Sequence, residues 1–255
     1  MRRIIALLVS SFVLAAQPLA AQQIDYGTVV EEVAFAGPEA GGARLLEVDP
    51  AQTLKSIAAY GPFRVIDETH AALVDVTDET SPDTFAAMLR DHPGIATLEM
   101  ITCPGTEDDR ANLRLGLMIR EKGIATHVPD DGFVGSGAVE LFLAGARRYA
   151  EPGAEFAVHS WEDDRGRQAG DYAPDAPKNR AYLDYYQAVG LTAPEAQAFY
   201  AMTNSVPFDS AKWLTRADMA HWVKLDTPQL PGQPFDTPFG ALTTLAVLDS
   251  APRLR

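Results

Sequence analysis

The chain has 255 residues, of which 47% are hydrophobic and 22% charged, a composition typical of a globular protein rather than a disordered or coiled-coil one. Its 35 acidic and 21 basic residues give a formal net charge of −14, which argues against nucleic acid or an anionic membrane surface as a partner because both bind basic faces. A single cysteine, Cys103, excludes a disulfide scaffold and a cysteine-based zinc site.

The first residues have the pattern of a secretory signal peptide. Arg2 and Arg3 precede an apolar run over residues 4–16 that is too short to span a bilayer, and small residues follow. We therefore expect residues 1–21 to be removed, and the mature protein to be periplasmic or secreted without a stable membrane span. An uncleaved N-terminal anchor is the alternative.

Beyond this leader, the chain divides into three expected parts. Residues 22–62 are weakly patterned and are predicted to be an irregular segment, and residues 226–255 are rich in proline and are predicted to be a tail. Residues 63–225 form one expected domain in which strands and helices alternate. The expected strands are residues 63–66, 72–76, 97–102, 124–128, 147–150 and 155–159, and the expected helices begin near residues 81, 107, 135, 178, 193 and 216. This alternation favours an α/β fold with mainly parallel strand pairing.

Two short stretches contain side chains suited to catalysis. Ser136 lies between two glycines at the start of a predicted helix, where it is either a plain helix N-cap or a nucleophile. His159 ends an apolar strand before a polar loop, where it is either a boundary residue or a general base. The other histidines lack metal-ligand spacing, so we expect neither a metal nor a cofactor.

The order of these stretches along the chain is informative. A turn at Gly105 and Thr106 precedes a helix and offers backbone N–H groups, Ser136 follows about 30 residues later, and His159 closes a strand after that. Oxyanion donors, nucleophile and base in this order predict a serine hydrolase.

At these residues the sequence resembles the Clp-protease-like branch of the Clp/crotonase superfamily, and within it the exported bacterial proteins. The resemblance runs from about residue 63 to 225. It rests on blocks in matching order, at residues 100–106, 119–123, 126–129, 136–145, 147–154, 158–160 and 213–215. It implies a single domain built as a Clp/crotonase-like spiral of β-β-α units with mainly parallel sheets.

The resemblance also assigns roles to single residues. Ser136 matches the nucleophile and His159 the base, while Asp209 is the nearest match to the acid that orients the base. The carboxylates Asp163 and Asp164 are reserves for that role. The residues matched to the oxyanion hole are Gly105 and Thr106, with the backbone N–H of Gly137 as a neighbour.

The sequence departs from the family pattern in three ways. Thr106 stands where the family has a second glycine, and a β-branched residue there would be strained if the position required positive φ. Gly137 and Ala138 replace alanine and cysteine, and Glu140 places a charge on a helix that is usually apolar.

The resemblance implies an exported, acidic serine hydrolase, peptidase-like, that acts on a peptide or other acyl substrate and can assemble as a homo-oligomer. A catalytically degenerate Clp-like domain, acting as a periplasmic binding or interaction module, is the alternative. A crotonase-type enzyme acting on acyl-CoA ranks last, because an exported and strongly acidic protein suits that anionic ligand poorly.

Overall fold

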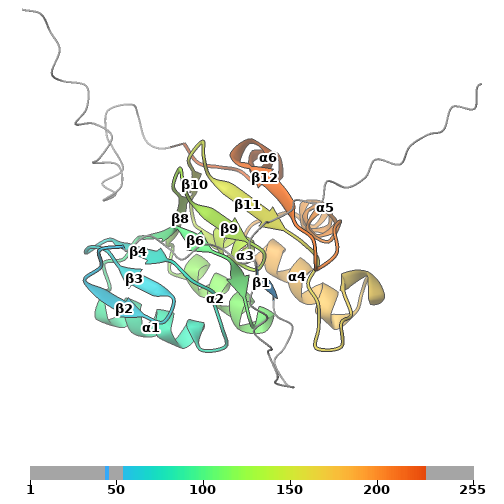
Figure 1. The fold of residues 1–255 in the computed structure, drawn as a ribbon, viewed down its shortest axis with the longest axis horizontal. Helices are drawn as coiled ribbons and strands as arrows, with labels where there is room; N and C mark the ends of the chain where they lie inside the picture. Colours follow the sequence, from blue (N-terminus) through green and yellow to red (C-terminus); the bar gives the residue numbers. More distant parts are fainter. Residues whose placement is uncertain (1–43, 46–53, 228–255) are drawn as a thin grey trace, which may run out of the picture. The chain divides into compact units, whose positions relative to one another are not determined.

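The computed structural model describes residues 44–45 and 54–227, which form one compact unit (Figure 1). The expected signal peptide over residues 1–21 lies outside the described residues. So do most of the expected irregular segment and the tail from residue 228 onward. No helix within the described segments is long and apolar enough to cross a bilayer.

Three β-β-α units follow one another and define the architecture (Figure 1). The units are β5 (Thr97–Met100), β6 (Thr102–Cys103) and α2 (Asp109–Glu121); β8 (Ala125–Val128), β9 (Phe133–Gly135) and α3 (Ala138–Ala144); and β10 (Arg148–Ala150), β11 (Glu155–Val158) and α4 (Pro177–Ala188). The first strand of each unit enters a six-stranded sheet and the second strand a four-stranded sheet. The chain therefore winds as a spiral between two sheets.

The strand order confirms the predicted α/β fold with mainly parallel pairing. The six-stranded sheet has the order β10-β8-β5-β4-β3-β2, and the four-stranded sheet has the order β12-β11-β9-β6. The four strands β4, β5, β8 and β10 are mutually parallel, as are β6, β9 and β11. Antiparallel pairing occurs at one end of each sheet. In one sheet it joins β2 (Ala58–Tyr60) to β3 (Phe63–Val65) and β3 to β4 (His70–Leu73), and in the other it joins β11 to β12 (Lys212–Thr215).

The remaining elements cover or connect the sheets. They are α1 (Ser81–Asp91), a 3₁₀ turn η1 (Ala169–Asp171), α5 (Ala193–Thr203), α6 (Arg216–Trp222) and a two-residue strand pair, β1 (Arg44–Leu45) with β7 (Gly105–Thr106). The last two helices begin with capping boxes, in which Thr192 bonds Glu195 and Thr215 bonds Asp218. These caps are readable from the sequence because the side chains satisfy the first backbone N–H groups of the helix.

The structure corrects the sequence-based elements in a few places. β1 and β2 lie within residues 22–62, which were expected to be irregular. β2 forms because Gly61 adopts φ 53° and turns the chain back onto β3. β9 and β12 were not expected, since strands of three or four residues carry little periodicity of their own.

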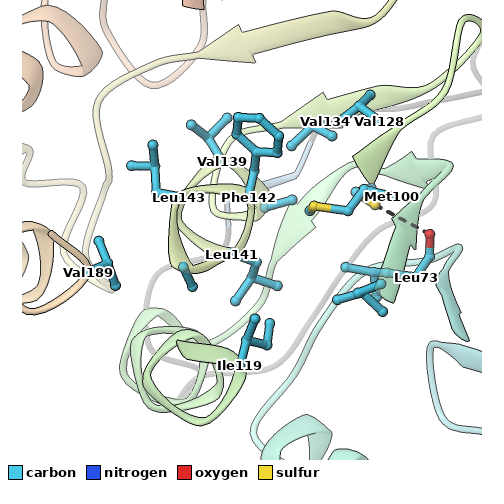
Figure 2. Packing of buried hydrophobic residues seen from close by; sticks show 14 of the residues in the cluster. Leu73, Met100, Ile119, Val128, Val134, Val139, Leu141, Phe142, Leu143 and Val189 are labelled. Carbon is cyan, nitrogen blue, oxygen red and sulfur yellow. Dashed lines mark hydrogen bonds between the residues drawn. The ribbon is translucent and has the colours of Figure 1, made fainter. Parts of the chain in front are cut away.

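Helix α3 lies at the centre of the core. All seven of its residues are buried, as expected for a helix surrounded by protein on every side. Figure 2 shows Leu141 directed toward Ile119 of α2, and Val139 and Phe142 on the side of the helix nearer Val134.

Two polar groups in this core have specific partners. The carboxylate of Glu140 accepts a hydrogen bond from the hydroxyl of Tyr186 at 2.7 Å, which accommodates the unexpected acid on α3. The thiol of Cys103 donates to the carbonyl of Leu73 at 3.4 Å. Burial raises the pKa of Cys103 well above its usual value, which disfavours the reactive thiolate form.

Candidate active site

The topology places Ser136 and His159 at the same sheet edge. Ser136 directly follows β9, and His159 directly follows β11. These two strands are parallel neighbours with Gly135 opposite Ala157, and the backbone N–H of Ser136 donates to the carbonyl of Ala157 at 2.7 Å. Since the carboxyl ends of parallel strands meet at one edge, two residues 23 positions apart in the sequence become neighbours.

Ser136 has a strained backbone and a hydroxyl without a structural role. Its φ is 54°, the only positive φ of a non-glycine residue in the described segments. The residue is 1% exposed, and its Oγ has no hydrogen-bond partner in the described part of the chain. The N-cap of α3 is Gly137, which provides no side-chain cap. The interpretation of Ser136 as a plain N-cap is therefore wrong.

His159 is held in the protonation pattern that a general base requires. The residue is fully buried, and its Nδ1 lies 2.9 Å from the carbonyl oxygen of Ser160. Because a carbonyl oxygen only accepts hydrogen bonds, Nδ1 carries the proton and Nε2 carries the lone pair. The ring of Phe208 packs edge-on against the imidazole with 5.2 Å between centroids, which fixes the ring plane.

The structure gives the imidazole an orienting partner that was not predicted. The carbonyl of Ser160 occupies the orienting role that the sequence assigned to Asp209. Asp209 lies in an exposed loop next to Phe208, and its carboxylate accepts a hydrogen bond from the hydroxyl of Ser210 at 3.4 Å. Asp209 stays a prediction as the third catalytic residue.

The reserve acid Asp163 has a different role. Its buried carboxylate accepts hydrogen bonds from the side chains of Tyr172, Arg167 and Lys178 and from two backbone N–H groups. Burial alone would raise the pKa of Asp163, but these hydrogen bonds outweigh it and hold the pKa well below its usual range. Asp163 thus anchors the loop after β11, while the neighbouring Asp164 is exposed.

The predicted oxyanion turn is a short strand rather than a free turn. Gly105 adopts φ 141°, which favours glycine, whereas Thr106 has no positive φ, so the strain anticipated for a β-branched residue is absent. Thr77 bridges β7 on one side, where the Thr77 N–H donates to the Gly105 carbonyl at 3.1 Å. On the other side β7 pairs with β1. Its backbone groups therefore take part in strand pairing, whereas the sequence analysis expected a turn with free N–H groups.

Thr106 and Gly137 fit one another. A Cβ atom placed on Gly137 would lie 2.5 Å from Cγ2 of Thr106, so the threonine side chain occupies the space that an alanine would need. The two departures from the family pattern therefore compensate. The contact also places the proposed oxyanion strand against the turn that carries Ser136.

A buried polar pair connects these two segments. Asn112 on α2 donates from Nδ2 to the carbonyl of Gly137 at 2.6 Å, and its Oδ1 accepts from the hydroxyl of Thr77 at 3.0 Å. Thr77 in turn holds Gly105 through the backbone bridge. Sequence reasoning missed both residues. The sequence does carry one signal for Asn112: this polar residue lies one turn before Leu115, on the face of an amphipathic helix that is expected to be buried.

Within the described segments, no group of three or more histidine, cysteine or acidic residues is arranged to hold a metal ion. The groups gathered at the site are a hydroxyl, an imidazole and backbone N–H groups, which suit acyl transfer.

Comparisons with known proteins give a limited picture. No protein-family model matches the chain, and no curated protein matches it. The similar solved structures include two mutants of the 1510-N membrane-bound stomatin-specific protease. One, in complex with a substrate peptide, has a TM-score of 0.38 and 16% identity over 58% of this chain and 71% of that chain. The other has a TM-score of 0.39 and 14% identity over 60% and 74%.

Proposed function

We propose that the chain is a serine hydrolase of the Clp-protease-like type that acts on a peptide or another acyl substrate. The observation that carries this proposal is Ser136, whose strained backbone presents a buried, unbonded hydroxyl at the strand edge where His159 is fixed with its lone pair on Nε2. Strained backbones and unsatisfied buried groups persist in folded proteins mainly where function requires them.

The geometry supports a two-step acyl transfer. Ser136 Oγ attacks the substrate carbonyl carbon as its proton passes to Nε2 of His159, and the carbonyl oxygen becomes an oxyanion. The imidazolium then protonates the leaving group as the bond to it breaks, leaving an acyl-enzyme. Water, deprotonated by His159, attacks the acyl carbon and releases the acid and the free Ser136 hydroxyl.

The oxyanion and the imidazolium both need stabilisation. Because β7 is paired with β1, the N–H of Gly137 is the proposed donor to the oxyanion, while Gly105 and Thr106 stay predictions for that role. Each such donor is worth about 3 kcal/mol of barrier. Ser160 orients the imidazole through its carbonyl, and Asp209 is proposed to compensate the positive charge. Asp209 suits this role because it adjoins Phe208, whose ring already contacts His159.

Export is part of the proposal. The basic and apolar start of the chain supports secretion into the periplasm or the medium. Hydrolysis of a peptide or another acyl group outside the cytoplasm needs no cofactor, which suits the chemistry of the site.

The test is pre-steady-state hydrolysis of p-nitrophenyl acetate by the purified chain. An acyl-enzyme produces a burst of nitrophenolate equal to the enzyme concentration. We expect the burst to be lost in S136A and H159Q and to be slowed in D209N. The exposed serine Ser56 provides the matched control, because S56A should retain the full burst. A burst that persists in S136A would disprove the proposed nucleophile.

A second candidate function is a non-catalytic binding module. One observation favours it: Ser136 is 1% exposed and His159 is fully buried, so the site is closed in this conformation. A chain that gives no burst with the small ester but binds an extended peptide would support this candidate over the hydrolase.

A further inference from the structure

The carbonyl that orients His159 belongs to the peptide unit between Ser160 and Trp161. This unit follows β11 and begins a long loop, where a backbone carbonyl can rotate unless the residues on both sides of it are held. Both residues are buried. The contacts that hold them therefore decide whether the carbonyl points at Nδ1 of the imidazole.

Ser160 is bonded to the segment that leaves α5. Its backbone N–H donates to the carbonyl of Val206 at 2.9 Å. Its hydroxyl lies 3.0 Å from Oδ1 of Asn204, the C-cap residue of α5, and 3.2 Å from the carbonyl of Trp161. Nδ2 of Asn204 donates to the carbonyl of Tyr200 at 2.8 Å. Because a carbonyl oxygen only accepts hydrogen bonds, this contact fixes the amide with Oδ1 toward the Ser160 hydroxyl.

Trp161 is bonded to the same helix. Its indole N–H donates to the hydroxyl of Tyr200 at 2.7 Å, and this hydroxyl donates to Oδ1 of Asn179 on α4 at 2.6 Å. Tyr200 and Asn204 are four residues apart, so they lie on one face at the end of α5. Their two side chains therefore hold the two ends of one peptide unit.

We propose that Tyr200 and Asn204 are positioning residues for the general base. By holding both ends of this peptide unit, they aim its carbonyl at Nδ1 of His159, so that the ring proton stays on Nδ1 and Nε2 keeps its lone pair. An imidazole that loses this acceptor distributes its proton between both nitrogens, and the form protonated on Nε2 cannot take a proton from Ser136. The inference rests on the proposed function in naming His159 as the base.

The segment after α5 contributes to the same support. Two residues beyond Val206, the ring of Phe208 packs edge-on against the imidazole of His159, with 5.2 Å between the ring centroids. The backbone N–H of Phe208 donates to Oε1 of Gln168 at 3.2 Å, which ties this segment to the loop after β11. Residues 200–208 therefore support both the carbonyl that bonds the imidazole and the ring that packs beside it.

The first experiment is NMR of the full chain labelled with nitrogen-15 histidine, which shows which imidazole nitrogen carries the proton. The spectrum of H159Q identifies the His159 signals. At a pH where this imidazole is neutral, wild type should carry the proton on Nδ1, whereas N204A and the nearly isosteric Y200F should share it between both nitrogens. S160A removes the bond to Asn204 from its other side and should behave like N204A.

T126V is the matched control for the loss of one buried hydrogen bond. The hydroxyl of Thr126 donates to the carbonyl of Phe142 at 2.8 Å, and neither residue contacts the imidazole. T126V should keep the wild-type spectrum of His159. A proton that stays on Nδ1 in N204A or in Y200F would overturn the positioning role of the residue replaced.

The second experiment measures the rate of the ester burst. N204A and Y200F should each slow the burst about tenfold or more, because part of the imidazole then carries its proton on the wrong nitrogen. A mere loss of stability lowers the amplitude of the burst rather than its rate, so T126V should keep the wild-type rate. Equal rates in all three variants would overturn the inference. A wild-type chain without a burst would disprove the proposed function, whereas the NMR spectra would still decide whether α5 orients the imidazole.

Discussion

Replacing Ser136 should make the protein more stable while abolishing its activity. In S136A the unbonded hydroxyl is removed from a site that is 1% exposed. An unsatisfied buried hydroxyl costs about 1–3 kcal/mol, so S136A should gain roughly 1–2 kcal/mol of unfolding free energy after loss of some packing. S136G additionally relieves the φ of 54°.

The size of that second gain follows from the backbone. A non-glycine residue in the left-handed region costs about 1–2 kcal/mol, and glycine adds about 0.4–1 kcal/mol of unfolded-state entropy that opposes the gain. S136G should therefore exceed S136A by about 0.5–1 kcal/mol. In a domain of this size each kcal/mol raises Tm by about 2–4 °C.

Urea denaturation and thermal melts of the variants test this reasoning. Ser160 is the matched control, since it is also buried but its hydroxyl lies 3.0 Å from Oδ1 of Asn204. S160A should lower the free energy of unfolding by about 1 kcal/mol. If S136A is destabilised as much as S160A, the Ser136 hydroxyl holds a structural hydrogen bond and the argument for a nucleophile fails.

Three further predictions concern packing and charge. G137A should lower the free energy of unfolding by about 1–3 kcal/mol, because the added Cβ clashes with Cγ2 of Thr106. T106S removes that methyl group, so a double-mutant cycle measured by urea denaturation should show that T106S rescues G137A. Additive losses of stability would contradict the fit between the two residues. D163N should lower the free energy of unfolding by about 2 kcal/mol at pH 7. It weakens the hydrogen bonds to a buried carboxylate, while the cations Arg167 and Lys178 are nearly half exposed and stay partly solvated. Because the pKa of Asp163 is lowered on folding, the stability that its carboxylate contributes is present above pH 3.8 and declines below it. The difference in unfolding free energy between D163N and wild type should therefore shrink in acid. A difference that does not change with pH would refute the role of the Asp163 carboxylate as an anchor. For His127, burial lowers the pKa but Glu99 and Glu151 outweigh it and raise the pKa above 6.5. The stability contributed by the charged imidazole is fully present below pH 6.5 and is lost as the pH rises through the raised pKa. H127Q should therefore lower the free energy of unfolding more at pH 6 than at pH 9. Equal losses at both pH values would contradict an ion pair between His127 and Glu99.

The sequence predicted helices better than strands. α5 was expected at residues 193–203 and is observed there, because a capping threonine and a proline at the start of a helix are local signals. β7 and β9 were missed as strands because two or three residues have no periodicity. They are strands only because a partner lies in register with them.

The sequence indicated only some residues of the candidate site. Ser136 and His159 were assigned to one site from their order along the chain and from the family resemblance, and the parallel strands β9 and β11 bring both residues to one sheet edge. Thr77 and Asn112 were not assigned to it, because their hydrogen bonds to distant segments leave no mark on the local pattern. The Ser160 carbonyl is a backbone group, and no sequence motif identifies a backbone acceptor for an imidazole.

The most direct test of the account is the site of covalent labelling by a fluorophosphonate probe. After the full chain is treated with the probe and digested, tandem mass spectrometry should find the phosphonyl group on Ser136. The H159Q chain should label much more slowly, since the hydroxyl loses its base. Label on a different serine, or equal labelling of the wild-type and H159Q chains, would contradict the claim that this hydroxyl and this imidazole act together.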